Sequence, residues 1–226
     1  MAVTGRRAGE FPTLRKSASE GSVLSFGPGV PAPLEAGRRF LNLYLNVRYG
    51  RIWDVPTFAT RRATLDDVSV LAETQRQGFA GYVAFLPRGW APPSTEIEAM
   101  GIAERLSQPD AWCVIAYDGL DVAGHVAIVA GRERTGDRGL IPGLAHLWML
   151  FIREPWWGTG LATSLLAMAA EEATARGYEA MRLYTPAGQA RARAFYEREG
   201  FAWTGWEAYE EPLRLVLVEY ARDPLG

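Results

Sequence analysis

Apolar and polar residues alternate or recur at regular spacing from about residue 57 to the end of the chain. Period-two alternation and short apolar runs predict strands, whereas a spacing of three to four residues predicts helices. The predicted strands cover residues 57–64, 112–117, 122–130, 145–152, 180–185, 201–209 and 213–220. The predicted helices cover about 65–77, 95–106, 161–176 and 187–199. The order β-α-α-β-β-β-α-β-α-β-β sets hairpins beside one β-α-β unit, which indicates an α/β fold with a mixed sheet and helices on both faces.

Capping residues mark several of these boundaries. Thr64 stands at the expected N-cap of the first helix, with Asp67 at its third helical position. Gly177 and Gly200 follow the two later helices, where glycine readily adopts the left-handed conformation. Residues 118–121, which include Gly119, predict the turn of an antiparallel hairpin.

The first 56 residues differ from the rest. Residues 1–34 are rich in Gly, Ser, Pro and Ala and are expected to be weakly ordered. Residues 35–56 are apolar and aromatic, and we expect an arm that packs on the domain formed by residues 57–222 or on a second subunit. The first 56 residues hold eight Lys or Arg and four Asp or Glu, about +4, so the remainder is about −6. This asymmetry favours docking of the arm, and a solvated tail is the alternative.

Composition narrows the class of protein. The 226 residues are 48% hydrophobic, and the net charge of −2 argues against a nucleic-acid partner, which usually requires a basic patch. No apolar run reaches the roughly 18–20 residues of a membrane span, and no apolar stretch follows Arg6 and Arg7 as a signal peptide would need, so a cytoplasmic location is expected. The single cysteine, Cys113, lies in an apolar run and is expected to be a buried strand residue. We expect no metal site.

The turn between the strand at 145–152 and the helix at 161–176 is a candidate anion site. Gly158 and Gly160 let the chain turn sharply there and leave main-chain amides uncovered. The first amides of a helix lack internal partners and lie at the positive end of the helix dipole, so they can cradle a phosphate. A purely structural role for the glycines is the alternative. The lysine of a P-loop and the third glycine of a Rossmann turn are both missing.

Two segments resemble the signatures of the GNAT superfamily of N-acetyltransferases. The run Trp157-Gly158-Thr159-Gly160-Leu161-Ala162 is similar to the family's acetyl-CoA motif, Gln/Arg-x-x-Gly-x-Gly/Ala, with Trp157 in place of Gln or Arg. About thirty residues later, Gln189-x-x-Ala192-x-x-Phe195-Tyr196 followed by Gly200-Phe201 resembles a second family motif, with Gln189 in place of Asn. The resemblance covers about residues 57–220.

The resemblance implies direct transfer of an acetyl group from acetyl-CoA to an amine, without a covalent enzyme intermediate. It implies a mostly antiparallel sheet in which the fourth and fifth strands are parallel and splay apart around the pantetheine arm. The amide near Leu150 would polarise the thioester carbonyl. Arg153 would meet a cofactor phosphate or be a plain surface arginine. The full set of expected cofactor-binding residues is Leu150, Phe151, Ile152, Arg153, Trp157, Gly158, Thr159, Gly160, Leu161, Ala162, Thr163, Gln189 and Tyr196.

Proton transfer needs an acid for the CoA thiolate and a base for the amine. Tyr196 stands where many family members keep the acid, although it could equally pack in the core. The position of the family's usual carboxylate holds Trp148. The nearest titratable residue, His146, is therefore the candidate base for the amine. His146 lies two residues upstream of Trp148, so strand alternation would place it on the same face as Trp148 and Leu150. A structural role for His146, or a remote or water-mediated base, is the alternative, and His125 is expected to be structural.

The acceptor is expected between the first two helices and the last hairpin. The candidate substrate-binding residues are Phe79, Tyr82, Trp148, Trp206 and Glu207. Aromatic rings beside carboxylates suit a small amine, which could be cationic; the alternative is that these rings are core and the glutamates are solvated. The aromatic segment 40–53 and the last hairpin could each support a homodimer. A GNAT-fold module that binds acyl-CoA or a protein partner without turnover is the competing function.

Overall fold

The computed structural model describes residues 58–86, 88–134, 138–211 and 213–225. The expectations for residues 1–34, for the arm at 35–56 and for a dimer contact through 40–53 lie outside the described residues. No helix among the described residues is long and apolar enough to cross a membrane.

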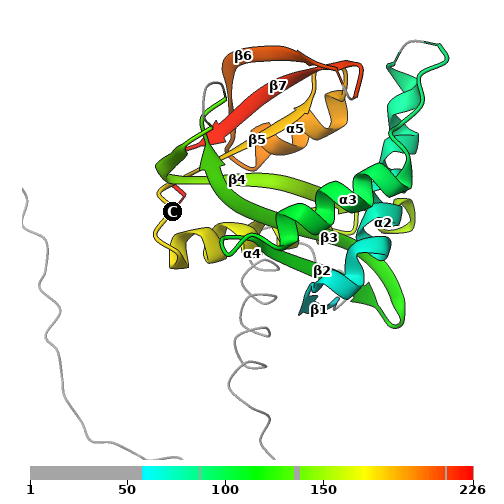
Figure 1. Ribbon diagram of the computed structural model, residues 1–226, viewed down its shortest axis with the longest axis horizontal. Coiled ribbons are helices and arrows are strands. Elements are labelled where there is room, and N and C mark those ends of the chain that lie inside the picture. The colour runs from blue at the N-terminus through cyan, green and yellow to red at the C-terminus, as the bar shows by residue number, and fades with distance from the viewer. Residues whose placement is uncertain (1–57, 87, 135–137, 212, 226) are drawn as a thin grey trace, which may run out of the picture. The chain divides into compact units, whose positions relative to one another are not determined.

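Seven strands form one mixed sheet in the order β1-β2-β3-β4-β5-β7-β6 (Figure 1). Only β4 and β5 are parallel, and every other neighbouring pair is antiparallel. This arrangement confirms the predicted mixed, mostly antiparallel sheet. The strands are β1 (Ala59–Arg62), β2 (Trp112–Asp118), β3 (Asp121–Arg132), β4 (Leu140–Ile152), β5 (Ala180–Pro186), β6 (Ala202–Glu210) and β7 (Leu215–Arg222).

Four α-helices cover the two faces of the sheet within the described residues. The helices are α2 (Val68–Ala80), α3 (Thr95–Leu106), α4 (Leu161–Ala175) and α5 (Ala190–Arg198), with 3-10 turns at η1 (Leu65–Asp67), η2 (Gly81–Ala84) and η3 (Glu154–Trp156). One core, which includes Leu165 and Tyr196, packs α4 and α5 against the sheet. A second core, which includes Leu71 and Ile102, packs α2 and α3 on the opposite face. The prediction of helices on both faces is therefore confirmed.

Most predicted boundaries agree with the structure to within a few residues. The largest difference is at the start of β4, which begins at Leu140 because Leu140 still pairs with Arg132 at the end of β3. Helix α5 begins at Ala190, with Gln189 as its N-cap. At the first helix, the Asp67 carboxylate accepts a hydrogen bond of 2.8 Å from the amide of Thr64, so the two residues act together in capping as the sequence predicts.

Strands β4 and β5 are paired over only part of their length. Their register runs from Leu144 opposite Ala180 to Leu147 opposite Leu183. Beyond these residues β4 continues beside β3, and β5 continues beside β7. The two parallel strands thus separate after Leu147 and Leu183. The separation leaves strand edges unpaired with each other, an arrangement that can accept an extended ligand through main-chain hydrogen bonds.

A β-bulge at Trp148 changes which side chains of β4 share a face. Ala127 lies opposite Met149 while Ile128 lies opposite Leu147, so Trp148 has no partner on β3. Trp148 packs with the α2/α3 core, whereas Leu150 packs with the α4 core. The expectation that Leu150 shares a face with Trp148 is therefore wrong, because an extra residue inverts the two-residue alternation of a strand.

Candidate active site

The glycine turn between β4 and α4 is open on its outer side. Gly158 has a φ of 79° and Gly160 a φ of 87°, in the left-handed region that favours glycine. A Cβ built on either glycine would meet no heavy atom within 4 Å. The two glycines are therefore required by the path of the chain and not by close packing, and the space beside the turn is free.

Several amides at this turn are unsatisfied. Among the described residues, none forms a hydrogen bond with the amide of Gly158, Thr159, Gly160, Ala162 or Thr163. The amide of Leu161 reaches only the hydroxyl of Thr159, at 3.4 Å. These donors lie at the N-terminal end of the fifteen-residue helix α4, where the helix dipole is positive. Together they form a site suited to a phosphate or diphosphate.

Trp157 is anchored to the end of β4. Its indole Nε1 donates to the carbonyl oxygen of Ile152 at 2.7 Å. The ring is 41% exposed, and the guanidinium of Arg191 on α5 lies 4.3 Å from the ring centroid. Sequence reasoning did not single out Arg191, because it belongs to neither motif. The fold nevertheless places its positive charge beside the glycine turn, where the family motif would have its own polar residue.

Other residues near the turn have definite partners. The guanidinium of Arg153 donates to the hydroxyl of Thr74 on α2 at 2.8 and 3.0 Å, so Arg153 is held against α2. The hydroxyl of Thr163 donates to the carboxylate of Glu199 at 2.9 Å, which leaves only its amide for an anion. Gln189 makes no side-chain cap for α5.

Tyr196 and Tyr82 lie on opposite faces of the sheet and are close enough to interact electrostatically. Tyr196 belongs to the α4 core and contacts Phe195 and Phe201 edge to face, while Tyr82 follows α2 and lines the opposite face. Burial raises the pKa of the Tyr196 phenol well above its usual value, and the neighbouring Tyr82 raises it further. The phenol therefore stays protonated at neutral pH, as a proton donor must.

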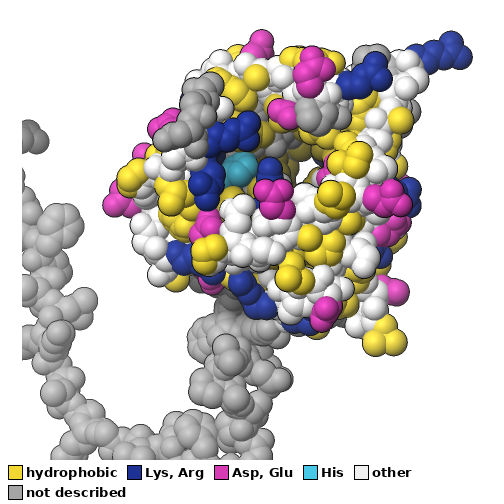
Figure 2. All heavy atoms as spheres, in the orientation of Figure 1, with side chains coloured by type: hydrophobic (Ala, Val, Ile, Leu, Met, Phe, Trp, Pro, Cys, Tyr) yellow, Lys and Arg dark blue, Asp and Glu magenta, His cyan; other side chains and the backbone are white. Residues whose placement is uncertain are grey.

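A cleft of about 1150 Å³ lies on the α2/α3 face of the sheet. Figure 2 shows it as a hollow with basic, acidic and apolar side chains around it. Its walls come from α2, α3, β4, β5 and the β6–β7 hairpin. The structure places four of the expected substrate-binding residues on its lining, Phe79, Tyr82, Trp148 and Trp206. Glu207 is exposed and does not line the cleft, because it lies on the other side of β6 from Trp206 and Glu210.

His146 lies on the floor of this cleft. Its Nδ1 is 3.3 Å from the carbonyl oxygen of Arg182 on β5, and its ring is 5.2 Å from the ring of Tyr184. Burial, together with the positive charges of Arg182 and Arg105, lowers the pKa of His146 to about 3. Because a neutral ring beside a carbonyl donates through Nδ1, Nε2 keeps its lone pair.

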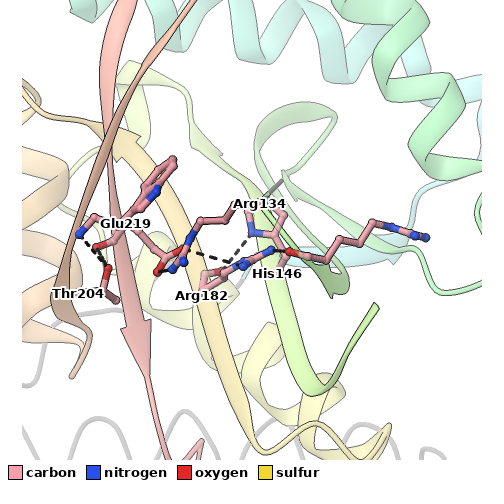
Figure 3. Close-up of polar contacts among 7 residues, drawn as sticks. Arg134, His146, Arg182, Thr204 and Glu219 are labelled. Atoms are coloured by element: carbon pink, nitrogen blue, oxygen red, sulfur yellow. Dashed lines mark hydrogen bonds and ion pairs between the residues drawn. The ribbon is translucent and has the colours of Figure 1, made fainter. Parts of the chain in front are cut away.

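A buried charge network lies next to His146 (Figure 3). Glu219 on β7 is only 2% exposed and accepts two hydrogen bonds from Arg134, one of them at 2.8 Å. Arg182 is 6% exposed, donates to the carbonyl oxygen of Arg132 and lies 3.9 Å from Glu219. No sequence pattern predicts this network, because Arg134 and Glu219 are 85 residues apart and belong to no motif.

Arg105 on α3 contacts Trp148 on β4. Its guanidinium lies 5.1 Å from the ring centroid of Trp148, so α3 and β4 contact each other across the cleft.

His125 on β3 is fully buried, and neither ring nitrogen has a hydrogen-bond partner among the described residues. It packs 5.7 Å from the ring of Phe151, which agrees with the structural role expected for it.

The comparisons agree with one another. The model of the acetyltransferase (GNAT) family matches residues 84–201. An uncharacterised N-acetyltransferase of Escherichia coli (strain K12), YjgM, is 30% identical over 143 residues, which cover 62% of this chain and 80% of that protein.

Solved structures share the fold. The PaiA N-acetyltransferase of Thermoplasma acidophilum, solved in complex with coenzyme A, is 16% identical with a TM-score of 0.53 and covers 74% of this chain and 99% of its own. An N-acetyltransferase of Staphylococcus aureus Mu50 is 17% identical with a TM-score of 0.57 and covers 75% of this chain and 99% of its own.

Proposed function

The chain belongs to the acetyltransferase (GNAT) family and is an N-acetyltransferase, and we propose that it transfers the acetyl group of acetyl-CoA directly to the primary amine of a small molecule. One observation carries the proposal. An open turn of unpaired amides follows β4 at the end where β4 and β5 have separated. An anion site at that end and a gap between two strands suit a cofactor that has a diphosphate on a long, amide-containing arm.

The turn would offer hydrogen-bond donors and positive charge to the diphosphate of the cofactor. The free amides of residues 158–160, 162 and 163 would donate to its oxygens, and the α4 dipole would favour its negative charge. Arg191, stacked on Trp157, would add a mobile cation beside the turn. Trp157 therefore serves as a platform in place of the Gln or Arg of the family motif. Leu161 at the N-terminus of α4 and Gln189 at the N-terminus of α5 would contact the cofactor through main-chain atoms.

The gap between the strands would hold the thioester. The edge of β4 that faces the gap would offer main-chain groups of Leu150 and Ile152 to the pantetheine and to the thioester carbonyl oxygen, where an amide donor stabilises the oxyanion as the tetrahedral intermediate forms. Phe151 would not take part through its main chain, because its carbonyl points toward Gly124 on β3. The carbonyl oxygen of Ile152 already accepts from Trp157. It would therefore use only its second lone pair for the cofactor. Arg153, held by Thr74, has no part in this proposal.

Tyr196 would protonate the departing sulfur. The amine attacks the carbonyl carbon of the thioester, the tetrahedral intermediate collapses, and the C–S bond breaks. The thiolate then takes a proton from the phenol of Tyr196, and the phenol is restored by a proton from solvent, which also receives the proton that the amine has lost. Because burial keeps this phenol protonated, it is ready to donate whenever the thiolate forms.

His146 would accept a hydrogen bond from the attacking amine through Nε2. A pKa of about 3 makes the ring neutral throughout the working range, so its lone pair is always available, but the same pKa makes it a weak base. His146 therefore orients the amine and takes its proton only as the nitrogen becomes acidic in the tetrahedral intermediate. The rate of acetyl transfer would then not fall, as the pH is lowered, at the usual pKa of a histidine.

Calorimetric titration with CoA, acetyl-CoA and ATP, followed by thiol release with a panel of primary amines, tests the proposal. CoA and acetyl-CoA should bind, and ATP should bind more weakly because it lacks the pantetheine arm that the strand gap would hold. Thiol release should require both acetyl-CoA and an amine. CoA binding without thiol release from any amine would favour a binding module without turnover, and absence of CoA binding would exclude the proposed cofactor site.

A further inference from the structure

The floor of the acceptor cleft holds a buried guanidinium group, that of Arg182, which is poorly neutralised. Arg182 is 94% buried, since only 6% of it is exposed, and its Nε has no hydrogen-bond partner among the described residues. Its nearest described carboxylate, on Glu219, is 3.9 Å away and already accepts two hydrogen bonds from Arg134. One buried carboxylate therefore serves two buried or half-buried arginines, which leaves an excess of positive charge at this point.

Arg105 reaches the same cleft from α3. It stacks on Trp148 and forms no ion pair with any described carboxylate, although the carboxylates of Glu104, Glu98 and Glu210 act on its charge from a longer distance. Arg105, Arg182 and His146 all line the cleft, and each arginine disfavours the charged form of the histidine ring. A buried guanidinium with an unpartnered Nε, as in Arg182, is costly, and a ligand carboxylate would satisfy it through charge-assisted hydrogen bonds.

We propose that the acceptor carries a carboxylate or similar oxyanion beside its amine, and that Arg182 and Arg105 hold this group above His146. The inference rests on the function proposed above and specifies its substrate class as amino-carboxylates. Glu207, which suggested a cationic acceptor, lies outside the cleft, and Glu210, which lines the cleft, acts on the charge of Arg105. Neither glutamate compensates Arg182, so recognition by this arginine is the better fit.

The position of the arginines along the strands suits such a molecule. His146 and Arg182 are register partners, one pair before Leu147 and Leu183, the last pair before the strands separate. At about 3.3 Å per residue, Arg182 lies roughly 7 Å along β5 from Tyr184, which borders the gap. The amine of an amino acid whose carboxylate met the long side chain of Arg182 could therefore reach a thioester in the gap.

An anion bound there would also act on His146. A negative charge beside Arg182 and Arg105 opposes the effect of their positive charges on the imidazole. The acceptor would therefore raise the basicity of the residue that orients its amine. This gives the proposal a readout that does not depend on turnover.

The first test compares acceptors that differ only in the carboxylate, such as phenylalanine with phenylalaninamide and lysine with lysinamide. The amide has the more acidic ammonium group and more free amine at neutral pH, so a preference for the carboxylate must come from binding. We expect the carboxylate acceptors to have the higher kcat/KM. Equal values, or a preference for the amides, would overturn the proposal.

The second test uses variants. Arg182→Met should raise KM for the carboxylate acceptors about ten- to a hundredfold, the loss of one or two charge-assisted hydrogen bonds, and leave the amides within about twofold. Arg105→Gln, at the exposed rim, should do the same to a smaller extent and covers the case in which Arg182→Met does not fold. Arg76→Gln, which changes an arginine bound to Glu73 on the surface of α2, should affect neither class. Equal losses for both classes would assign Arg182 and Arg105 a merely structural role.

The third test follows the ring resonances of His146 by NMR at neutral pH in the CoA-bound protein. Titration with N-acetylphenylalanine should shift these resonances, and N-acetylphenylalaninamide should not. If no amine releases CoA, the proposed function fails, yet this titration still decides the anion site. Absence of a shift with the carboxylate would refute the site even in an active enzyme.

Discussion

The indole NH of Trp157 donates a hydrogen bond to the main-chain carbonyl of Ile152, with 2.7 Å between Nε1 and the oxygen. Five residues separate the two, and the bond closes the chain between the end of β4 and the glycine turn. The same indole lies under the guanidinium of Arg191. One side chain therefore fixes the turn and presents a cation from α5 to it.

The first prediction concerns this pair. Trp157→Phe removes the hydrogen bond but keeps an aromatic platform, and Arg191→Gln removes the cation. Each should weaken CoA binding about three- to tenfold, the worth of one hydrogen bond or one exposed cation, and the loss in Arg191→Gln should shrink at high salt. Calorimetry measures both.

The matched control for Arg191 is Arg198→Gln, which removes an exposed arginine from the same helix, where it lies against Phe195 and 3.6 Å from Glu199. CoA affinity should stay unchanged in that variant. Equal weakening by the two glutamine substitutions would show that the effect reports net charge and not the position of Arg191.

The second prediction concerns the proposed acid. Tyr196→Phe should lower kcat about ten- to a hundredfold with little change in CoA affinity, because only the hydroxyl is removed and it forms no described hydrogen bond. Tyr178→Phe, a half-buried tyrosine of the same core, should leave kcat unchanged. Full turnover in Tyr196→Phe would return Tyr196 to a packing role.

The third prediction separates strain from anion binding at the turn. Gly160→Ala forces a side chain into a φ of 87° and should cost about 1 kcal/mol of stability, together with a loss of CoA affinity as the amides shift. Gly119→Ala introduces comparable strain in the β2–β3 hairpin, at a φ of 59° and with open space around its Cβ. Thermal unfolding should detect a loss in both variants, and calorimetry should detect weaker CoA binding only in Gly160→Ala.

The fourth prediction concerns packing under the cleft. A Cβ on Gly78 of α2 would lie 2.3 Å from Cδ1 of Phe151, so Gly78→Ala must displace a ring that lines the cleft and should destabilise the fold. Gly101→Ala in α3 meets nothing within 4 Å and should stabilise the helix by up to about 1 kcal/mol. Unfolding in urea distinguishes the two. Stabilisation by Gly78→Ala would mean that Phe151 has room to move.

The fifth prediction is the loss of stability in acid. Burial lowers the pKa of both His125 and His146 to about 3, below the value of about 6.5 expected in the unfolded chain. Between pH 6.5 and pH 3 the unfolded state therefore binds more protons, and the free energy of unfolding falls as the pH falls. The slope of the free energy of unfolding against pH should approach about 1.4 kcal/mol per pH unit for each histidine.

His125→Leu tests this origin, because it removes one of the two titrating groups from an apolar site. Urea unfolding between pH 5 and pH 7 should show a slope lower by about one proton than in the unchanged protein. An unchanged slope would place the acid sensitivity on other groups.

The order of elements, the two motifs and the glycine turn could all be predicted from the amino-acid sequence. These features are local, because capping residues, turn glycines and hydrophobic periodicity act within a few positions of the chain. For the same reason the positive φ values of Gly158 and Gly160 and the boundary of α4 agree with what the residues predict. The fold of the family followed from the same two segments.

The chemistry of the cleft floor could not be predicted in this way, because it depends on contacts between distant segments. The bulge at Trp148 depends on the register between β3 and β4, and it moved Leu150 to the opposite face. The placement of Arg134 on Glu219 and of His146 beside Arg182 joins segments that are far apart in the chain. Burial and neighbouring charge set the pKa of a side chain, and both arise only when distant strands meet.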